Sequence, residues 1–204
     1  MKNKPKWFVF LLVFLLCFFT APNAVFANCK HGKPTHNDHI LNGGVGQYGA
    51  NHRYYWVSSS LSSGQQSIVA TAVDQWVNTT YTPGVITSIS IKKTINQTDS
   101  SFDVYKVSLP SGYTGKTNHA YYSNSVDPNN SNWGWTLLEI DFTQMNSLSY
   151  STPKITGVVS HELGHAMGLA HRTDTDSVMY LYDTGRVYQR PTASDCHNIN
   201  HIYG

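Results

Sequence analysis

The segment HELGHAMGLAH, residues 161–171, combines three histidines, one glutamate and two glycines. On a helix, His161 and His165 would lie about 5.4 Å apart on one face, so both imidazoles could bind one zinc ion at about 2.0–2.1 Å. On the same helix His171 would lie about 9 Å further along and about 120° away from that face, so it can join them only if the helix ends in between. Gly168 favours such an end, because glycine adopts the left-handed backbone conformation without a Cβ clash.

Three neutral histidines leave one position of a tetrahedral zinc open, which is typical of catalytic sites. Zinc lowers the pKa of a water in that position to about 7, and Glu162 is placed to take its proton. We therefore expect His161, His165 and His171 to be metal ligands and Glu162 to be the catalytic base of metal-assisted amide hydrolysis. We expect Gly164 to allow close packing and assign it no chemistry.

A helix that begins after Ser151-Thr152-Pro153 must position these residues, since a hydroxyl N-cap followed by proline in the first turn is a preferred start. An apolar stripe at helical spacing should face the core, with the histidines on the opposite face toward a cleft. The stripe consists of Ile155, Val159, Leu163, Ala166, Met167 and Ala170.

The remaining elements follow from hydrophobic periodicity. A helix is expected around the apolar residues of 68–77, with the TPG of 82–84 ending it. Strands are expected at 52–61, 86–95, 103–109, 119–125 and 136–143.

The N-terminus, residues 1–27, has the order of a secretory signal peptide: three lysines, an apolar run and the small-residue segment APNAVFA. The apolar run falls short of the roughly 18 residues of a membrane-spanning helix. We expect cleavage after Ala27 and a secreted, extracellular protein. Loss of three lysines turns the net charge of +2 into about −1, so charge indicates neither nucleic acid nor membrane as a partner. We expect a monomer with one domain over 51–204.

Residues 28–50 lack periodicity and are expected to form an irregular N-terminal arm. Four residues of this arm could be metal ligands, namely His31, His36, Asp38 and His39. We expect a solvated tail rather than a metal site. Cys29 and Cys196 remain after signal removal, and a disulfide between them would add about 4–5 kcal/mol in the chain-entropy model. Two free thiols, or Cys29 as a metal ligand, are the alternatives.

The spacing of residues 161–171 matches the HExxHxxGxxH signature of metzincin zinc peptidases, and Met179 in SVMY resembles their Met-turn. The chain is most similar to the matrixin branch, because its ending SDCHNINHIYG resembles the matrixin C-terminal helix. HAYY at 119–122 resembles the segment before the substrate-binding edge strand.

The resemblance implies an α+β fold. Its features would be a twisted, mostly parallel sheet with an antiparallel edge strand, an active-site helix and a C-terminal helix. It also implies a zinc-dependent endopeptidase that binds a protein or peptide substrate along an edge around 119–124. The alternative is a secreted, non-catalytic binding or toxin-like protein on the same scaffold.

The sequence also departs from the matrixin pattern. Leu181 stands where matrixins usually have proline and where other metzincins have a metal-binding tyrosine, so Tyr180 and Tyr182 are not assigned as ligands. His119 matches one ligand of the matrixin structural zinc, but the others are missing, so one Zn²⁺ is expected. Ca²⁺ has little support, since Asp127 is the one candidate and a turn explains it. Cys29 lacks the matrixin latency motif, and the S1′ side-chain preference of 172–190 is not predicted.

Overall fold

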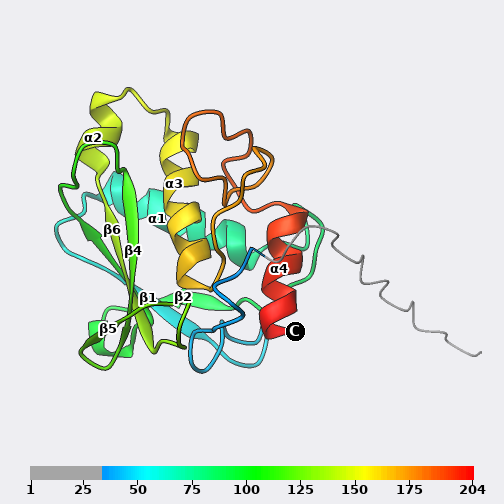
Figure 1. Ribbon diagram of the computed structural model, residues 1–204. Helices are drawn as coiled ribbons and strands as arrows, with labels where there is room; N and C mark the ends of the chain where they lie inside the picture. Colours follow the sequence, from blue (N-terminus) through cyan, green and yellow to red (C-terminus); the bar gives the residue numbers. More distant parts are fainter. Residues whose placement is uncertain (1–33) are drawn as a thin grey trace, which may run out of the picture. The chain divides into compact units, whose positions relative to one another are not determined.

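The computed structural model of the 204-residue chain describes residues 34–204 (Figure 1). The expected signal peptide, Cys29 and His31 lie outside these residues. Within the described part, no helix is both long enough and apolar enough to cross a bilayer.

A six-stranded sheet in the order β2-β1-β3-β6-β4-β5 forms the centre of the fold. Strands β2, β1, β3 and β6 run parallel, β4 is antiparallel to β6, and β5 pairs antiparallel with the last three residues of β4. The strands are β1 (Arg53–Val57), β2 (Ile91–Lys93), β3 (Phe102–Lys106), β4 (Gly115–Tyr121), β5 (Asn124–Val126) and β6 (Trp135–Ile140). The predicted mostly parallel sheet of an α+β fold is confirmed.

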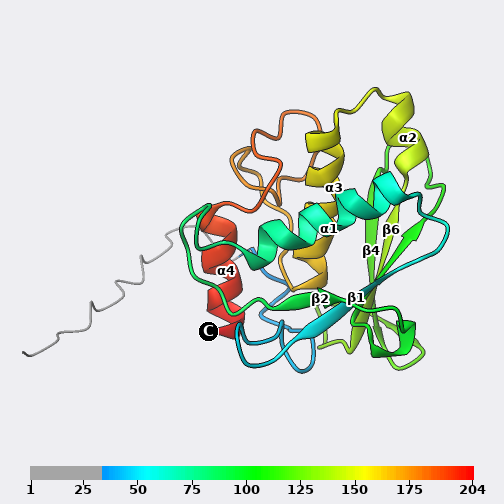
Figure 2. The same ribbon diagram turned by 180° about the vertical axis from the view of Figure 1, so that it is seen from behind.

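Two long helices, α1 and α3, pack against each other and against the same face of the sheet (Figures 1 and 2). The helices of the described residues are α1 (Ser63–Val77), α2 (Phe142–Ser147), α3 (Thr152–Ala166) and α4 (Ala193–Tyr203), and a short 3-10 turn, η1, spans Gln97–Asp99. The indole N–H of Trp76 on α1 donates to the backbone oxygen of Ser160 on α3 at 2.9 Å, and Trp76 is fully buried. This hydrogen bond holds α3 against α1 in the core.

Several boundaries differ from the sequence prediction. Helix α1 already ends at Val77, before the predicted TPG stop. The strand expected at 86–95 shortens to β2, and the one at 119–125 is a hairpin whose turn contains Tyr122 at φ +51°. The strand expected at 136–143 ends at Ile140, because the side chain of Asp141 accepts from the amide of Gln144 and caps α2.

The solvated-tail interpretation of the arm is wrong for its described residues. The amide of His36 donates to the oxygen of Gly168 at 3.1 Å, and the amide of Ala170 donates to the oxygen of Pro34 at 2.7 Å. Leu41 in the same arm is fully buried. The arm therefore packs along the segment that follows α3, because it carries apolar side chains and backbone groups that this segment needs as partners.

Candidate metal centre

Helix α3 and the turn after it bring the three histidines together. The helix ends at Ala166, and Gly168 adopts φ +103°, so the chain turns back as the spacing predicts. Ser151 is at the N-cap with extended backbone and proline follows in the first turn, but the Ser151 hydroxyl makes no capping hydrogen bond. His171 then returns to the face of the helix that carries His161 and His165.

The three Nε2 atoms converge on one point. Nε2 of His165 lies 3.0 Å from Nε2 of His161 and 3.1 Å from Nε2 of His171. Among residues 34–204, these three side chains form the one group of histidines, cysteines and acids whose ligand atoms all lie within 4.8 Å of one another. Nitrogens bound to a single tetrahedral zinc at about 2.1 Å would be about 3.4 Å apart, so the cluster has the right size.

The contacts of the Nδ1 atoms determine the tautomers of His161 and His165. Nδ1 of His161 lies 2.8 Å from the oxygen of Val178, and Nδ1 of His165 lies 2.7 Å from the oxygen of Leu169. A carbonyl oxygen only accepts, so each Nδ1 carries the hydrogen and each Nε2 of the neutral ring presents a lone pair. Lone pairs that face each other at about 3 Å repel unless a cation lies between them, so the donor set fits a zinc ion.

Burial keeps these rings neutral. Helix α3 is buried along the whole stretch from Ile155 to Ala166, including both of its histidines. Loss of solvent lowers the pKa of His161 to about 3 and that of His165 well below its ordinary value. His171 is exposed, so the centre opens to solvent on its side. The expected division of α3 into an apolar face and a polar face is therefore incomplete, since the polar face is covered as well.

Glu162 is held beside the cluster by strand β4. Its side chain is buried, and Thr117 Oγ1 lies 2.7 Å from Glu162 Oε2 and 3.0 Å from the Glu162 backbone oxygen. Burial raises the pKa of Glu162 to about 7, and the hydrogen bond from Thr117 opposes that rise. A carboxyl group with such a pKa can both accept and return a proton near neutral pH.

Met179 lies directly under α3. A Cβ at Gly164 would come 2.2 Å from Met179 Sδ, and Met179 is fully buried. Gly164 therefore allows the close packing that the sequence predicts, and the Met-turn lies against the helix that carries the first two histidines.

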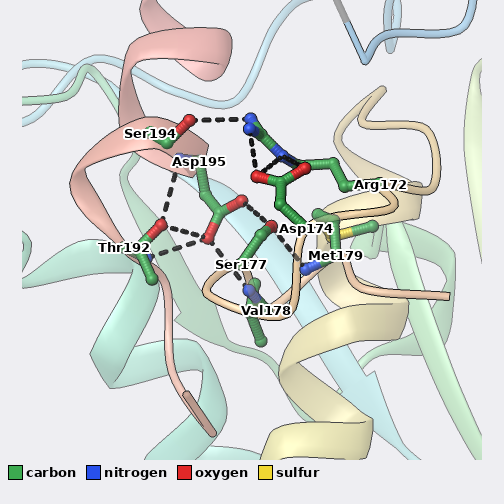
Figure 3. A network of polar contacts seen from close by, with 8 residues as sticks. All are labelled: Arg172, Asp174, Ser177, Val178, Met179, Thr192, Ser194 and Asp195. Atoms are coloured by element: carbon green, nitrogen blue, oxygen red, sulfur yellow. Dashed lines mark hydrogen bonds and ion pairs between the residues drawn. The ribbon is translucent and has the colours of Figure 1, made fainter. Parts of the chain in front are cut away.

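A buried carboxylate on α4 anchors this turn (Figure 3). Asp195 is fully buried and accepts hydrogen bonds from the Ser177 hydroxyl, from the Val178 amide at 3.1 Å, and from the amide and hydroxyl of Thr192. The oxygen of Val178 in turn accepts from His161, so one chain of contacts runs from α4 through the turn to the first histidine. The turn thereby sets the orientation of the His161 ring.

A second part of the same network holds the start of the loop (Figure 3). Arg172 donates to both carboxylate oxygens of Asp174 and to the Ser194 hydroxyl, the latter at 2.7 Å. Its amide donates to the oxygen of Met179 at 2.8 Å, and its own oxygen accepts from the amide of Leu181 at 3.1 Å. The residue after His171 is therefore tied to both the Met-turn and α4.

The histidines and Glu162 line a cleft of about 1060 Å³ between β4 and the loop after the Met-turn. One wall is β4, whose residues 115–118 pair with β6 on one side and with no described strand on the other. The expected substrate edge around 119–124 is wrong in position, because residues 119–121 are already paired with β5. The free edge lies nearer the N-terminus of β4, opposite Glu162.

Other residues that the sequence raised have structural partners. His119 is buried and its Nε2 donates to the oxygen of His165 at 3.0 Å. Its ring also packs against His36 and Trp133. Asp127 accepts from the Asn129 amide at 2.9 Å, which is the predicted turn.

The predicted disulfide falls partly outside the described residues. Cys196 is fully buried, and burial raises the pKa of its thiol to about 12, while Cys29 lies outside residues 34–204. The pairing stays a prediction.

Sequence reasoning missed Thr117 and the anchoring role of Asp195. Neither belongs to the histidine signature. The one available signal for Asp195 is its position three residues after Thr192, the spacing of a capping box, which the structure shows in full. Thr117 carries no such signal, because its contact with Glu162 spans 45 positions in sequence.

Comparisons with known proteins agree with this geometry. The family model of the matrixin peptidases, described as "Matrixin", matches residues 60–204. Matrix metalloproteinase-A of Caenorhabditis elegans is 49% identical over 47 residues, which are 23% of this chain and 9% of that protein. Matrix metalloproteinase-26 of Homo sapiens is 32% identical over 98 residues, 47% of this chain and 33% of that protein. Probable matrix metalloproteinase 095L of Invertebrate iridescent virus 3 is 42% identical over 50 residues, 24% of this chain and 12% of that protein.

The matching segments cover a third or less of each of these relatives. The family model, in contrast, covers well over half of the chain and includes α3, the Met-turn and α4. The chain belongs to the matrixin family.

Proposed function

We propose that this protein is a secreted, zinc-dependent endopeptidase. The observation that carries the proposal is the convergence of three Nε2 atoms, two of them on rings whose Nδ1 atoms donate to carbonyl oxygens. Membership of the matrixin family, whose name denotes peptidases, supports the same function. His161, His165 and His171 would hold the ion, and Glu162 would be the catalytic base.

The ion would supply two effects when bound: it acidifies a water in the open position and polarises the scissile carbonyl group. Glu162 accepts the proton of the attacking water and later donates it to the departing amine. Its position supports both roles, because the buried carboxyl group lies in the cleft beside the three histidines and is held there by Thr117. His161 and His165 need no proton change, since each Nδ1 keeps its hydrogen and donates it to the carbonyl oxygen of Val178 or Leu169.

The substrate would be an extended peptide segment. The free edge of β4 at 115–118 offers backbone hydrogen bonds along the cleft, and such strand addition gives affinity without dependence on a particular side chain. The chain would act as a monomer on proteins or peptides, with neither nucleic acid nor a membrane as partner.

Secretion would follow from the signal peptide at 1–27. The mature protein would then consist of an arm at 28–50 and the peptidase domain at 51–204. The arm would contribute to the domain, because its residues 34–36 bond to the segment between His165 and His171.

Metal analysis of the mature protein combined with a peptide-cleavage assay tests this function. We expect one zinc per chain, cleavage of an unfolded casein substrate, and loss of cleavage on chelation with recovery after zinc is added back. Glu162→Gln should keep the zinc and lose the cleavage. Unchanged cleavage by that variant would exclude the assigned base. One tightly bound zinc with no turnover on a diverse peptide library would favour the binding-protein alternative.

A further inference from the structure

Strand β4 contacts α3 through residues that are not among the three proposed zinc ligands. Side chains two apart on a strand share a face, so Thr117 and His119 both point toward α3, and a side chain at Gly115 would do the same. His119 reaches the backbone of His165, while the other two positions lie against Glu162. Strand β4 therefore contacts two successive turns of α3, the one that carries Glu162 and the one that carries His165.

The Thr117 hydroxyl has one hydrogen and two acceptors within reach. These are Oε2 of Glu162 at 2.7 Å and the backbone oxygen of Glu162 at 3.0 Å. The backbone oxygen lies inside α3, where the amide four residues later already bonds to it. The hydrogen bond therefore goes to the carboxylate, which is nearer and is the stronger acceptor when ionised.

Gly115 supplies the space on the other side of the carboxylate. A Cβ at this position would come 2.6 Å from Glu162 Oε1 and 2.8 Å from Glu162 Cγ. Any other residue would push the carboxylate away from β4. Among the described residues no donor bonds to Oε1, so that oxygen is free for a ligand in the cleft.

We propose that Thr117 is a positioning residue for Glu162: its hydroxyl holds Oε2 and leaves Oε1 to take the proton of the attacking water. The inference rests on the proposed peptidase function. Since the free edge of β4 at 115–118 includes Thr117, a peptide paired with that edge would lie on the same strand that orients the base. Substrate binding and base orientation would then depend on one element.

Thr117→Val tests the inference, because valine keeps the branched shape and removes the hydroxyl; Thr117→Ser restores the hydroxyl. For Val we expect kcat to fall about 10- to 100-fold, with KM changed less than about twofold and zinc content unchanged. For Ser we expect kcat within about threefold of the parent protein. Thr71→Val, at an exposed position of α1, is the matched control and should change neither parameter.

A second measurement does not depend on turnover. In crystal structures of the variants, the Glu162 carboxylate should keep its place in Thr117→Ser and leave it in Thr117→Val. Parent-like kcat for the Val variant, an equal loss in both variants, or a carboxylate that stays in place in the Val variant would overturn the inference. If the parent protein itself has no peptidase activity, the proposed function fails, and the crystal structures still decide whether Thr117 positions Glu162.

Discussion

Replacement of Asp195 by alanine tests whether α4 holds the Met-turn in place. The substitution removes the acceptor of two donors in the buried turn, the Ser177 hydroxyl and the Val178 amide. Each donor left unsatisfied costs about 1–3 kcal/mol. It also removes half of the capping box with Thr192, which costs about 1 kcal/mol more. We expect the free energy of unfolding to fall by about 3–7 kcal/mol.

Asp195→Asn separates the charge from the geometry. An amide oxygen can still accept from Val178 and Thr192, and the amide nitrogen can donate to the Ser177 oxygen, so we expect a loss of only about 1–2 kcal/mol. Urea denaturation of the metal-free proteins measures both values, with Asp74→Ala on the exposed face of α1 as the control, expected within about 0.5 kcal/mol of the parent. An alanine variant as stable as the control would refute the anchoring role of Asp195.

Three further predictions concern the packing and the ion. Gly164→Ala should destabilise the fold by about 1–3 kcal/mol and weaken zinc binding, because the new Cβ overlaps Met179 Sδ. Urea denaturation and zinc titration measure the two effects, and parent-like values for both would contradict the prediction. Trp76→Phe should cost about 1–3 kcal/mol, since it removes a hydrogen bond to the Ser160 oxygen and leaves a cavity where the buried indole stood; a lower urea midpoint with an unchanged slope would show it, and a parent-like midpoint would contradict it. Chelation should lower the thermal midpoint, because zinc at 100 times its dissociation constant adds about 2.7 kcal/mol to the folded state; equal midpoints with and without zinc would argue against a folded-state site.

The helix and its end could be predicted from sequence because their causes are local. Apolar periodicity, the proline in the first turn and Gly168 all act within α3 and the residues after it, and the structure has the helix from Thr152 to Ala166 with Gly168 at φ +103°. The expectation that His171 returns to the other two histidines rests on helix geometry together with the premise that all three bind one ion.

The predictions that fail, or are missing, concern features that depend on distant parts of the chain. The sequence pattern predicts a solvated tail around His36, but its backbone bonds to Gly168 and its ring lies against His119 and His165. The resemblance places the substrate edge around 119–124, but the tight hairpin at Tyr122 returns β5 onto the last three residues of β4, so the free edge lies earlier in the strand. Nothing in the local pattern shows which half of a strand will be covered.

Zinc K-edge X-ray absorption of the mature protein, loaded with one zinc per chain, addresses the proposed centre most directly. We expect three imidazole nitrogens and one solvent oxygen at about 2.0–2.1 Å, with one imidazole lost in His171→Ala. A thiolate ligand, a fourth ligand from the protein, or a spectrum unchanged by the loss of His171 would contradict a three-histidine zinc site with an open position.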